Sequence, residues 1–330
     1  MAPEFPYEYT PTHPFLYQKE IKNLQYYILH IICIVTAPFL AIPKLLLVLI
    51  WMGVSAFFVS VFNVKNQNLP QSRIIYPIYR FFWWLVLKTQ FIHIRIINKP
   101  KQMQPVLISN HTNMNDVVTH GVLLAPKYLA RSDMFGAFGI GPVITANRSL
   151  SVQKNTSNAQ LLDDMKRICD EFNTSQTPLQ IFPEGTIAAE HCVLRFRAGA
   201  FRLNHDVQIV ALKYKKMLHN AWLCQSGLRH LIDLSCNFAS ILEYIYLDVV
   251  KNETPDQAGK RLADTLGRVY LPYTNEDYQW FNGKCDSKDR CTHEYIKDFG
   301  WMGQIDEWKQ KCSANNLDWR YFHEESYFKK

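Results

Sequence analysis

Short apolar runs alternate with polar, periodic stretches along the chain after residue 90. Over 161–172, apolar side chains recur at helical spacing and charged side chains fill the opposite face, which predicts an amphipathic helix against a sheet. A second helix is predicted to begin after Thr254, because Thr, Pro and Gln at 254, 255 and 257 fit a capping box. The apolar runs themselves predict strands of one core sheet at 91–97, 106–109, 179–182 and 207–212. This alternation of strands and helices indicates an α/β fold.

The N-terminal region has a different pattern. Residues 27–62 are almost continuously apolar, and Lys44 is their only formal charge. One membrane span needs about 20 apolar residues, so this run is long enough for two short spans or for a hairpin that enters one leaflet and returns. Its apolarity is nearly all-round, which argues against a pair of core helices in a soluble protein. Because a lysine is costly inside a bilayer, we expect a hydrophobic helical hairpin that bends at Pro43 and Lys44, with Lys44 beside headgroups or a phosphate.

Composition divides the chain into three parts. The segment 74–87 carries Tyr and Trp side chains of the kind enriched at membrane interfaces, so it is predicted to be a surface-lying helix. Residues 1–90 are therefore predicted to be a membrane-associated helical segment, and 91–274 a globular domain. The extension 275–330 contains twenty charged and twelve aromatic side chains. We expect it to bury tryptophans 280, 301, 308 and 319 against the protein's own sheet or against another subunit.

The net charge of +7 is spread along the chain without dense Lys/Arg runs. Nucleic acid is therefore not an expected partner, and an anionic membrane or a phosphorylated substrate fits the charge better. Eight cysteines without a Cys-x-x-Cys pair are too sparse for a disulfide scaffold and favour a reducing compartment. The first fifteen residues lack the basic and apolar regions of a cleavable signal, so a retained segment is expected to provide any membrane targeting.

A histidine and an aspartate follow the predicted strand 106–109. Asn110 and His111 come directly after it, and Asp116 lies five residues beyond the histidine. Five residues turn an ideal helix through about 140°, so the imidazole and the carboxylate meet only if a turn separates them. A carboxylate that holds one ring nitrogen as a donor leaves the other nitrogen to accept a proton, as a general base must. Taken alone the pattern is weak, because a chance match in a loop explains it equally well.

Three further elements follow in a fixed order. The strand-like run 141–148 ends in Arg148, whose guanidinium suits bidentate phosphate binding. The predicted strand 179–182 leads into a Pro-Glu-Gly-Thr turn at 183–186, where glycine allows close backbone approach and threonine offers a hydroxyl. Arg197, in a Phe-Arg-Ala-Gly stretch, adds a second basic element. Four elements in this order are more specific than any one of them.

With these residues the sequence resembles the glycerolipid acyltransferases, which have an Asn-His-x-x-x-x-Asp motif and a Phe-Pro-Glu-Gly-Thr motif. The stretches 182–201 and 266–278 are similar to the lysophosphatidylcholine acyltransferase branch and its glycerol-3-phosphate relatives. The resemblance implies a mixed sheet flanked by helices, with 91–274 as the acyltransferase domain. It also implies transfer of an acyl group from acyl-CoA, as co-substrate, to the hydroxyl of a lysophospholipid or glycerol phosphate. No metal and no other cofactor are implied.

The resemblance assigns roles to individual residues. His111 would be the general base and Asp116 its partner, while Arg148 would bind the acceptor phosphate. The other substrate-binding residues would be Asn110, Glu184, Gly185, Thr186 and Arg197. Ile187 departs from the basic or small residue that is common in the family at this position, and 207–212 lacks a frequent proline. These departures leave the choice of acceptor open.

The resemblance implies membrane lipid as a partner and the endoplasmic reticulum membrane as the location, with a mitochondrial membrane as the alternative. A second functional hypothesis is an accessory subunit of a large membrane complex that keeps the acyltransferase fold and binds lipid without catalysis. In that case the Trp-rich extension 275–330 would contact a protein partner. A soluble thioesterase is disfavoured, because a hydrolase needs no membrane segment.

Overall fold

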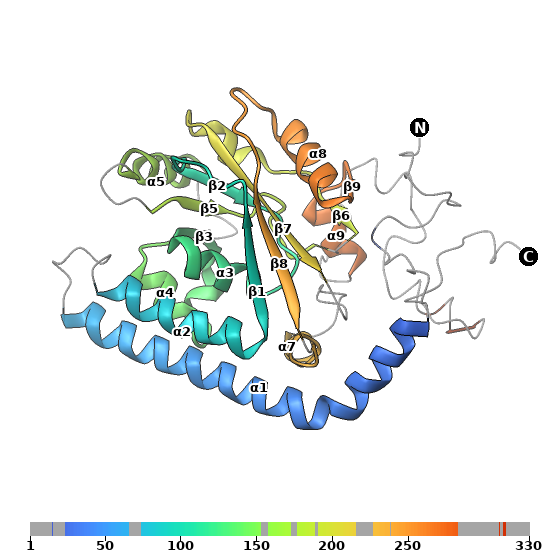
Figure 1. The fold of residues 1–330 in the computed structure, drawn as a ribbon. Coiled ribbons are helices and arrows are strands. Elements are labelled where there is room, and N and C mark those ends of the chain that lie inside the picture. The colour runs from blue at the N-terminus through green and yellow to red at the C-terminus, as the bar shows by residue number, and fades with distance from the viewer. Residues whose placement is uncertain are drawn as a thin grey trace, which may run out of the picture.

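A seven-stranded sheet forms the centre of the computed structural model (Figure 1). The structure describes residues 15, 24–65, 74–152, 158–172, 177–188, 191–215, 227–237, 239–282, 310 and 313–314. The strand order is β1-β8-β7-β2-β5-β3-β4. The strands are β1 (Ile92–Ile97), β2 (Val106–Ser109), β3 (Lys127–Arg131), β4 (Leu150–Val152), β5 (Leu179–Ile181), β7 (Val207–Lys215) and β8 (Ser240–Tyr246). β7 and β8 pair antiparallel and the other neighbours pair parallel, so the predicted mixed sheet of an α/β fold is confirmed.

The predicted strands are all present, and the run 106–109 forms β2 with the predicted bounds. Every side chain of β2 is buried, as expected for a parallel strand that is covered on both faces. Helices α2 (Ile75–Thr89) and α3 (Asn115–Leu124) contribute to the hydrophobic cluster on one face. On the other face lie α5 (Asn158–Asp170) and α8 (Pro255–Leu266), the two helices predicted from periodicity and capping. The predicted capping box at Thr254 is confirmed.

Short elements complete the domain. They are the helices α4 (Gly141–Ala146), α7 (Gly227–Ser235) and α9 (Asn275–Phe281), the paired strands β6 (Cys192–Val193) and β9 (Val269–Tyr270), and the 3-10 turns η1 (Ser132–Gly136) and η2 (Ala198–Arg202). The strand-like interpretation of 141–148 is wrong, because its first part is the helix α4. Pro142 stands in the first turn of α4, where a missing backbone N–H costs no hydrogen bond. Cys169 is a free, buried thiol.

The hairpin that we expected within 27–62 is not formed. α1 (Leu24–Lys65) is one helix of 42 residues that continues through Pro43, so a hairpin turn at Pro43 and Lys44 is wrong. A different antiparallel pair is present, because α2 returns along α1. Trp51 Nε1 donates to Thr89 Oγ1 at 3.2 Å. Seven residues later on α1 and seven earlier on α2, Phe58 stacks on Phe82 with ring centroids 6.0 Å apart.

Lys44 faces the protein. Its side chain is buried, and its Nζ donates to the backbone oxygen of Asn237 at 2.5 Å, just beyond the C-terminal end of α7. The same ammonium lies 4.1 Å from the centroid of the Phe91 ring. A cation is favoured at the negative end of a helix dipole and over an aromatic ring, so both contacts stabilise the buried ammonium. The expected position of Lys44 beside headgroups is wrong.

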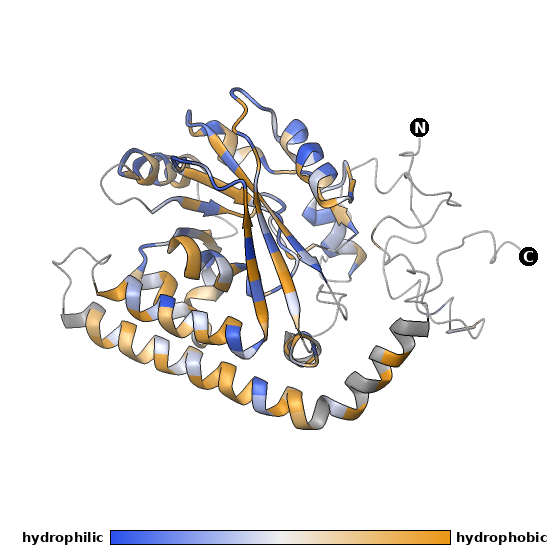
Figure 2. Cartoon of the chain, viewed as in Figure 1, coloured by the Kyte–Doolittle hydropathy of each residue, from blue (hydrophilic) through white to orange (hydrophobic). Residues whose placement is uncertain are grey.

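α1 lies along the base of the molecule and has two faces (Figures 1 and 2). Its window 39–62 is long and apolar enough to cross a membrane, and 28% of that window is buried inside the protein. The inner face packs into the core through Val48, Met52 and Val59. The outer face exposes large apolar side chains, among them Ile42, Leu46, Ile50 and Phe57. α1 is therefore both a part of the hydrophobic core and an exposed apolar surface.

The predicted surface helix and the predicted extension both have residues in the described part of the chain. On α2, Tyr79 and Trp83 are fully buried while Phe81 and Trp84 are exposed, so only one face of this predicted surface helix lies at the surface. Trp280 of α9 is buried, as one of the two alternatives for the extension expects. The other three tryptophans of the extension lie outside the described residues, and the boundaries at 90 and 274 stay predictions.

Candidate active site

Parallel strands β2, β5, β3, β4 and β7 end at one edge of the sheet, and the predicted chemistry begins at this edge. His111 follows β2, and the Phe-Pro-Glu-Gly-Thr segment follows β5. α3 begins at Asn115, so Asp116 lies in its first turn. The carboxyl ends of parallel strands are where open α/β sheets bind ligands.

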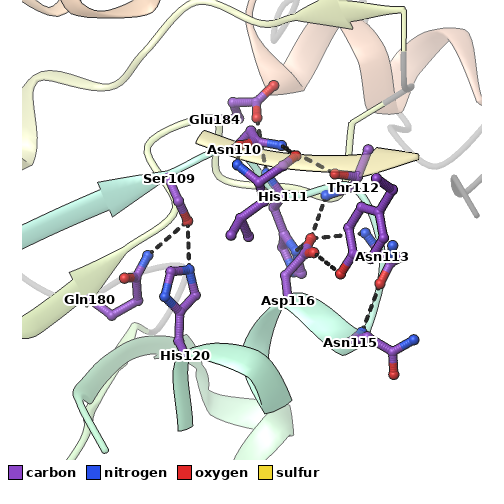
Figure 3. A network of polar contacts seen from close by, with 12 residues as sticks. Ser109, Asn110, His111, Thr112, Asn113, Asn115, Asp116, His120, Gln180 and Glu184 are labelled. Atoms are coloured by element: carbon purple, nitrogen blue, oxygen red, sulfur yellow. Dashed lines mark hydrogen bonds and ion pairs between the residues drawn. The ribbon is translucent and has the colours of Figure 1, made fainter. Parts of the chain in front are cut away.

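The imidazole of His111 and the carboxylate of Asp116 meet (Figure 3). Nδ1 of His111 lies 3.0 Å from Oδ2 of Asp116. The same oxygen accepts from the backbone N–H of Thr112 at 2.6 Å and of Asn113 at 3.0 Å. These bonds close a turn between the two residues, as the spacing in the sequence required. The carboxylate thus holds both the loop and the ring.

Asp116 is fully buried and carries its charge at neutral pH. Burial alone would raise its pKa, but the hydrogen bonds from His111 and from the two backbone N–H groups outweigh burial and hold the pKa below its usual range. Its other oxygen, Oδ1, accepts from the hydroxyl of Tyr214 at 2.8 Å. An ionised carboxylate only accepts hydrogen bonds, so Nδ1 of His111 carries the proton and Nε2 keeps its lone pair.

The ring of His111 is stacked and partly open. It lies against Phe182 with centroids 4.1 Å apart and planes 19° from parallel. The side chain is 14% exposed, and within the described part of the chain no hydrogen bond involves its Nε2. A basic nitrogen on an oriented, accessible ring is the arrangement that a general base needs.

Glu184 supports the histidine from behind. Its side chain is buried, with Oε1 accepting from the backbone N–H of His111 at 3.2 Å and Oε2 from that of Leu194 at 2.9 Å. Burial raises its pKa to about 7. Glu184, a predicted substrate-binding residue, therefore links the loop that carries His111 to the chain after β6 through two hydrogen bonds.

The next residues of the motif meet the first turn of α9. Gly185 has φ +71°, and a Cβ there would lie 2.8 Å from Nδ2 of Asn275, so the site needs glycine. Asn275 donates to the carbonyl of Gly185 at 3.1 Å and accepts from Arg197 Nη2 at 2.9 Å. Arg197 also pairs with Glu276 and is more than half exposed. Thr186 is half-buried beside this cluster. The structure thus brings Gly185, Thr186 and Arg197 to the same edge as His111.

Asn110 is held by β7. Its Nδ2 donates to the carbonyl of Leu212 at 3.0 Å, and its Oδ1 accepts from the N–H of Leu212 at 2.8 Å. The side chain is buried and extends the pairing of β2 with β7 by one step. Its amide is engaged with the protein backbone, which gives Asn110 a structural role, and its predicted substrate contact stays a prediction.

Arg148 is separated from the other predicted residues. The strand register places it level with Lys127 and Val106, where the strands begin, two residues before β4. His111 lies five residues further along, about 16 Å in the strand direction. Burial raises the pKa of Tyr76 on α2, and the nearby Arg148 guanidinium opposes that rise, which also locates Arg148 at the α2 side. The structure therefore does not bring Arg148 together with His111, and its role as acceptor-phosphate binder stays a prediction.

Comparison with known proteins agrees with this geometry. Residues 92–215, which run from β1 to β7, match the family model named Acyltransferase. The resemblance to glycerolipid acyltransferases is confirmed. The chain is 26% identical over 190 residues to lysophospholipid acyltransferase LPEAT2 of Arabidopsis thaliana, covering 55% of this chain and 34% of that protein. It is 29% identical over 138 residues to human lysophosphatidylcholine acyltransferase 1, covering 37% of this chain and 25% of that protein.

The chain thus spans about a third or less of these two relatives. Among solved structures, the 1-acyl-sn-glycerophosphate acyltransferase PlsC from Thermotoga maritima aligns with a TM-score of 0.46 at 13% identity, over 68% of this chain and 93% of that chain.

Reasoning from the sequence missed two residues near this edge of the sheet. Tyr214 was overlooked because the strand was predicted to end at Leu212, whereas β7 runs to Lys215. Strand alternation from the longer β7 would have placed Tyr214 on the same face as Leu212. Arg131 ends β3 level with Asn110, so it is a basic residue at the correct edge, and it pairs with Asp133. The register, which sequence alone does not reveal, was needed to find it.

A second histidine lies beneath the site. Ser109 Oγ accepts from Nε2 of Gln180 at 3.1 Å and lies 2.9 Å from Nε2 of His120, within hydrogen-bond distance. Nδ1 of His120 is hydrogen-bonded to the hydroxyl of Tyr244 at 2.8 Å. Ser109 is fully buried, and Figure 3 shows it between Gln180 and His120. Within the described residues, no group of three or more His, Cys, Asp or Glu side chains is placed to hold a metal ion.

Proposed function

We propose that the chain transfers an acyl group from acyl-CoA to the hydroxyl of a lysophospholipid or of glycerol phosphate. The observation that carries the proposal is the pairing of His111 with the buried Asp116 at 3.0 Å, on a partly exposed ring. The match of residues 92–215 to the acyltransferase family supports the reaction class. The similarity to a lysophospholipid acyltransferase and a lysophosphatidylcholine acyltransferase supports the acceptor class.

The proposed mechanism is direct transfer. His111 Nε2 takes the proton of the acceptor hydroxyl while that oxygen attacks the thioester carbonyl. The tetrahedral intermediate expels the CoA thiolate, which takes the proton back from the imidazolium, and the products are the acyl ester and CoA. Asp116 stabilises the imidazolium between these steps, and base catalysis of this kind contributes about 10²–10⁴ in rate. Ser109 is buried and bonded to His120 and Gln180, so it is not the nucleophile of this scheme.

The acceptor phosphate is proposed to bind at Arg197 and Arg131. Both guanidinium groups are well exposed at the edge that carries His111. Each is paired with one carboxylate, that of Glu276 or Asp133, which a phosphate would displace or join. Guanidinium groups bind phosphate through paired N–H donors, so the two arginines are suitable partners.

Membrane attachment is proposed through α1. Its outer face exposes a row of apolar side chains that a lipid surface would cover. Lysophospholipids reside in membranes, so this face would keep the site beside its acceptor. The proposed location is the endoplasmic reticulum membrane, with a mitochondrial membrane as the alternative.

The test is release of CoA thiol by the purified full chain with acyl-CoA and a panel of lysophospholipids and glycerol 3-phosphate. We expect turnover on at least one acceptor and a loss of at least about 100-fold in His111→Ala. His205→Ala is the matched control, because His205 also pairs with an aspartate, Asp170 at 3.1 Å, just before β7 begins at the opposite edge.

Full turnover in His111→Ala would overturn the mechanism. No turnover of the wild type on any acceptor would overturn the enzymatic function and favour the accessory-subunit hypothesis.

A further inference from the structure

β7 contacts both ends of the catalytic loop 110–116. At one end, the backbone of Leu212 pairs with the side chain of Asn110 through two hydrogen bonds of 3.0 and 2.8 Å. At the other end, the hydroxyl of Tyr214 donates to Oδ1 of Asp116 at 2.8 Å. The two β7 residues are two apart, so both face the loop. A single strand therefore fixes the loop that carries His111.

The two oxygens of Asp116 have different partners. Oδ2 is bonded to His111 and to two backbone N–H groups. Among the described residues, the donor to Oδ1 is Tyr214, and the carboxylate is fully buried. A buried carboxylate oxygen needs a donor, because water cannot solvate it there. Tyr214 therefore fixes the rotation of the carboxylate and takes a share of its charge.

We infer that Tyr214 is a positioning residue for the proposed acyl transfer, acting on His111 through Asp116. This inference rests on the proposed function for its kinetic consequences. The hydroxyl holds Oδ2 toward Nδ1 of His111, so that the ring keeps its orientation against Phe182. It also moderates the negative charge that the imidazole faces.

The other ionisable groups around His111 and Asp116 either keep one protonation state or do not hydrogen-bond the Asp116 carboxylate. His120 and His230 are kept neutral, since burial lowers the pKa of His120 to about 3 and that of His230 to about 4. Glu184 reaches His111 through the backbone N–H. The guanidinium of Arg268 interacts electrostatically with Asp116 and with Tyr214. Of the side chains that hydrogen-bond Asp116 directly, Tyr214 is the one besides His111 in the described structure.

The first experiment compares Tyr214→Phe with Tyr128→Phe in the full chain. Tyr128 is an equally buried tyrosine whose hydroxyl donates to the carbonyl of Val117 at 2.8 Å, so the two variants lose the same group. We expect Tyr214→Phe to lower kcat about 10- to 100-fold with little change in KM for acyl-CoA and acceptor, because positioning acts on the chemical step. Tyr128→Phe should leave kcat within about twofold.

The pH dependence of kcat distinguishes a positioning role of Tyr214 from a purely structural role. Without the tyrosine donor, more of the Asp116 charge falls on His111 and favours its protonated form. The acid limb of the kcat profile should therefore move to higher pH in Tyr214→Phe and stay in place in Tyr128→Phe. Fluorotyrosine at 214, a stronger donor of unchanged shape, should move the limb to lower pH. This variant keeps the test available if Tyr214→Phe does not fold.

A second readout needs no turnover. Diethyl pyrocarbonate modifies neutral imidazole, so its rate at His111, measured by peptide mass spectrometry across pH, should shift in the same directions. If the wild type is inactive but the modification profile of His111 shifts in Tyr214→Phe, the proposed function is wrong and the coupling between Asp116 and Tyr214 is still supported. Unchanged kcat and unchanged profiles in Tyr214→Phe, or the same changes in Tyr128→Phe, would overturn the inference.

Discussion

His120 is a neutral histidine held between two hydroxyls. It is fully buried, and burial lowers its pKa to about 3, against 6.5 for a free imidazole. The folded protein therefore leaves His120 unprotonated in a range where the unfolded chain protonates it. Stability from this group is fully present above about pH 6.5 and is lost as the pH falls below that value.

Acid should therefore weaken the fold through this one residue. Between pH 7.5 and pH 5, we expect His120 to account for a loss of about 2 kcal/mol in the free energy of unfolding. His120→Gln should be less stable at pH 7.5 but should lose less between the two pH values, as measured by Tm in detergent. The surface variant His205→Gln should keep the wild-type loss. Equal losses in wild type and His120→Gln would contradict the assignment.

Arg197 and Arg148 provide a matched test of which edge binds the acceptor phosphate. Arg197→Gln should raise KM for phosphate-bearing acceptors about 10-fold or more and leave KM for acyl-CoA unchanged, because one charge-assisted phosphate contact is lost. Arg148→Gln, at the opposite edge, should change neither. Glu276→Gln should lower the acceptor KM, since it removes the carboxylate that pairs with Arg197. A raised acceptor KM in Arg148→Gln alone would place the acceptor elsewhere.

The contact between α2 and α3 depends on a missing side chain. Gly121 of α3 lies so close to the indole of Trp83 that a Cβ would be 2.3 Å from two ring carbons. Gly121→Ala should push the helices apart and cost about 1–3 kcal/mol of stability, as overpacking of a close-packed core does. Gly136→Ala is the control, because a Cβ there meets nothing within 4 Å. Equal Tm values for the two variants would contradict this packing.

The elements predicted correctly from the sequence are those determined by residues that are close together in the chain. β2 follows from the apolar run Val106, Leu107 and Ile108, and α8 from the capping box at Thr254. His111 and Asp116 were predictable because one short turn brings them together. The position of Arg148 was not, since it depends on the register of β3, β4 and β5. Lys44 was misplaced for the same kind of reason, because its partner Asn237 is 193 residues away.

At the scale of the whole molecule, α1 is a long apolar surface joined to a folded domain. Its 42 residues have a contour length of about 63 Å, which is about twice the hydrocarbon thickness of a bilayer. Lys44 and the core residues of its inner face hold the part of α1 from Lys44 onward against the domain. The helix bends, and its N-terminal part extends beyond α7 (Figures 1 and 2). On α2, Phe81 and Trp84 add exposed aromatic surface. We expect this apolar side to rest in the plane of a membrane.

A single charge on the outer face of α1 should therefore weaken membrane binding without unfolding the protein. Ile50 is 52% exposed on α1, and Val250, which follows β8, is 45% exposed, so Ile50→Glu and Val250→Glu make the same change on two surfaces. Sedimentation with phosphatidylcholine–phosphatidylglycerol vesicles should show binding about 10-fold weaker for Ile50→Glu, because a carboxylate resists burial in lipid. Val250→Glu should bind like the wild type, and both variants should keep the wild-type Tm. If Ile50→Glu binds vesicles as well as Val250→Glu does, the lipid surface lies on another face of the molecule.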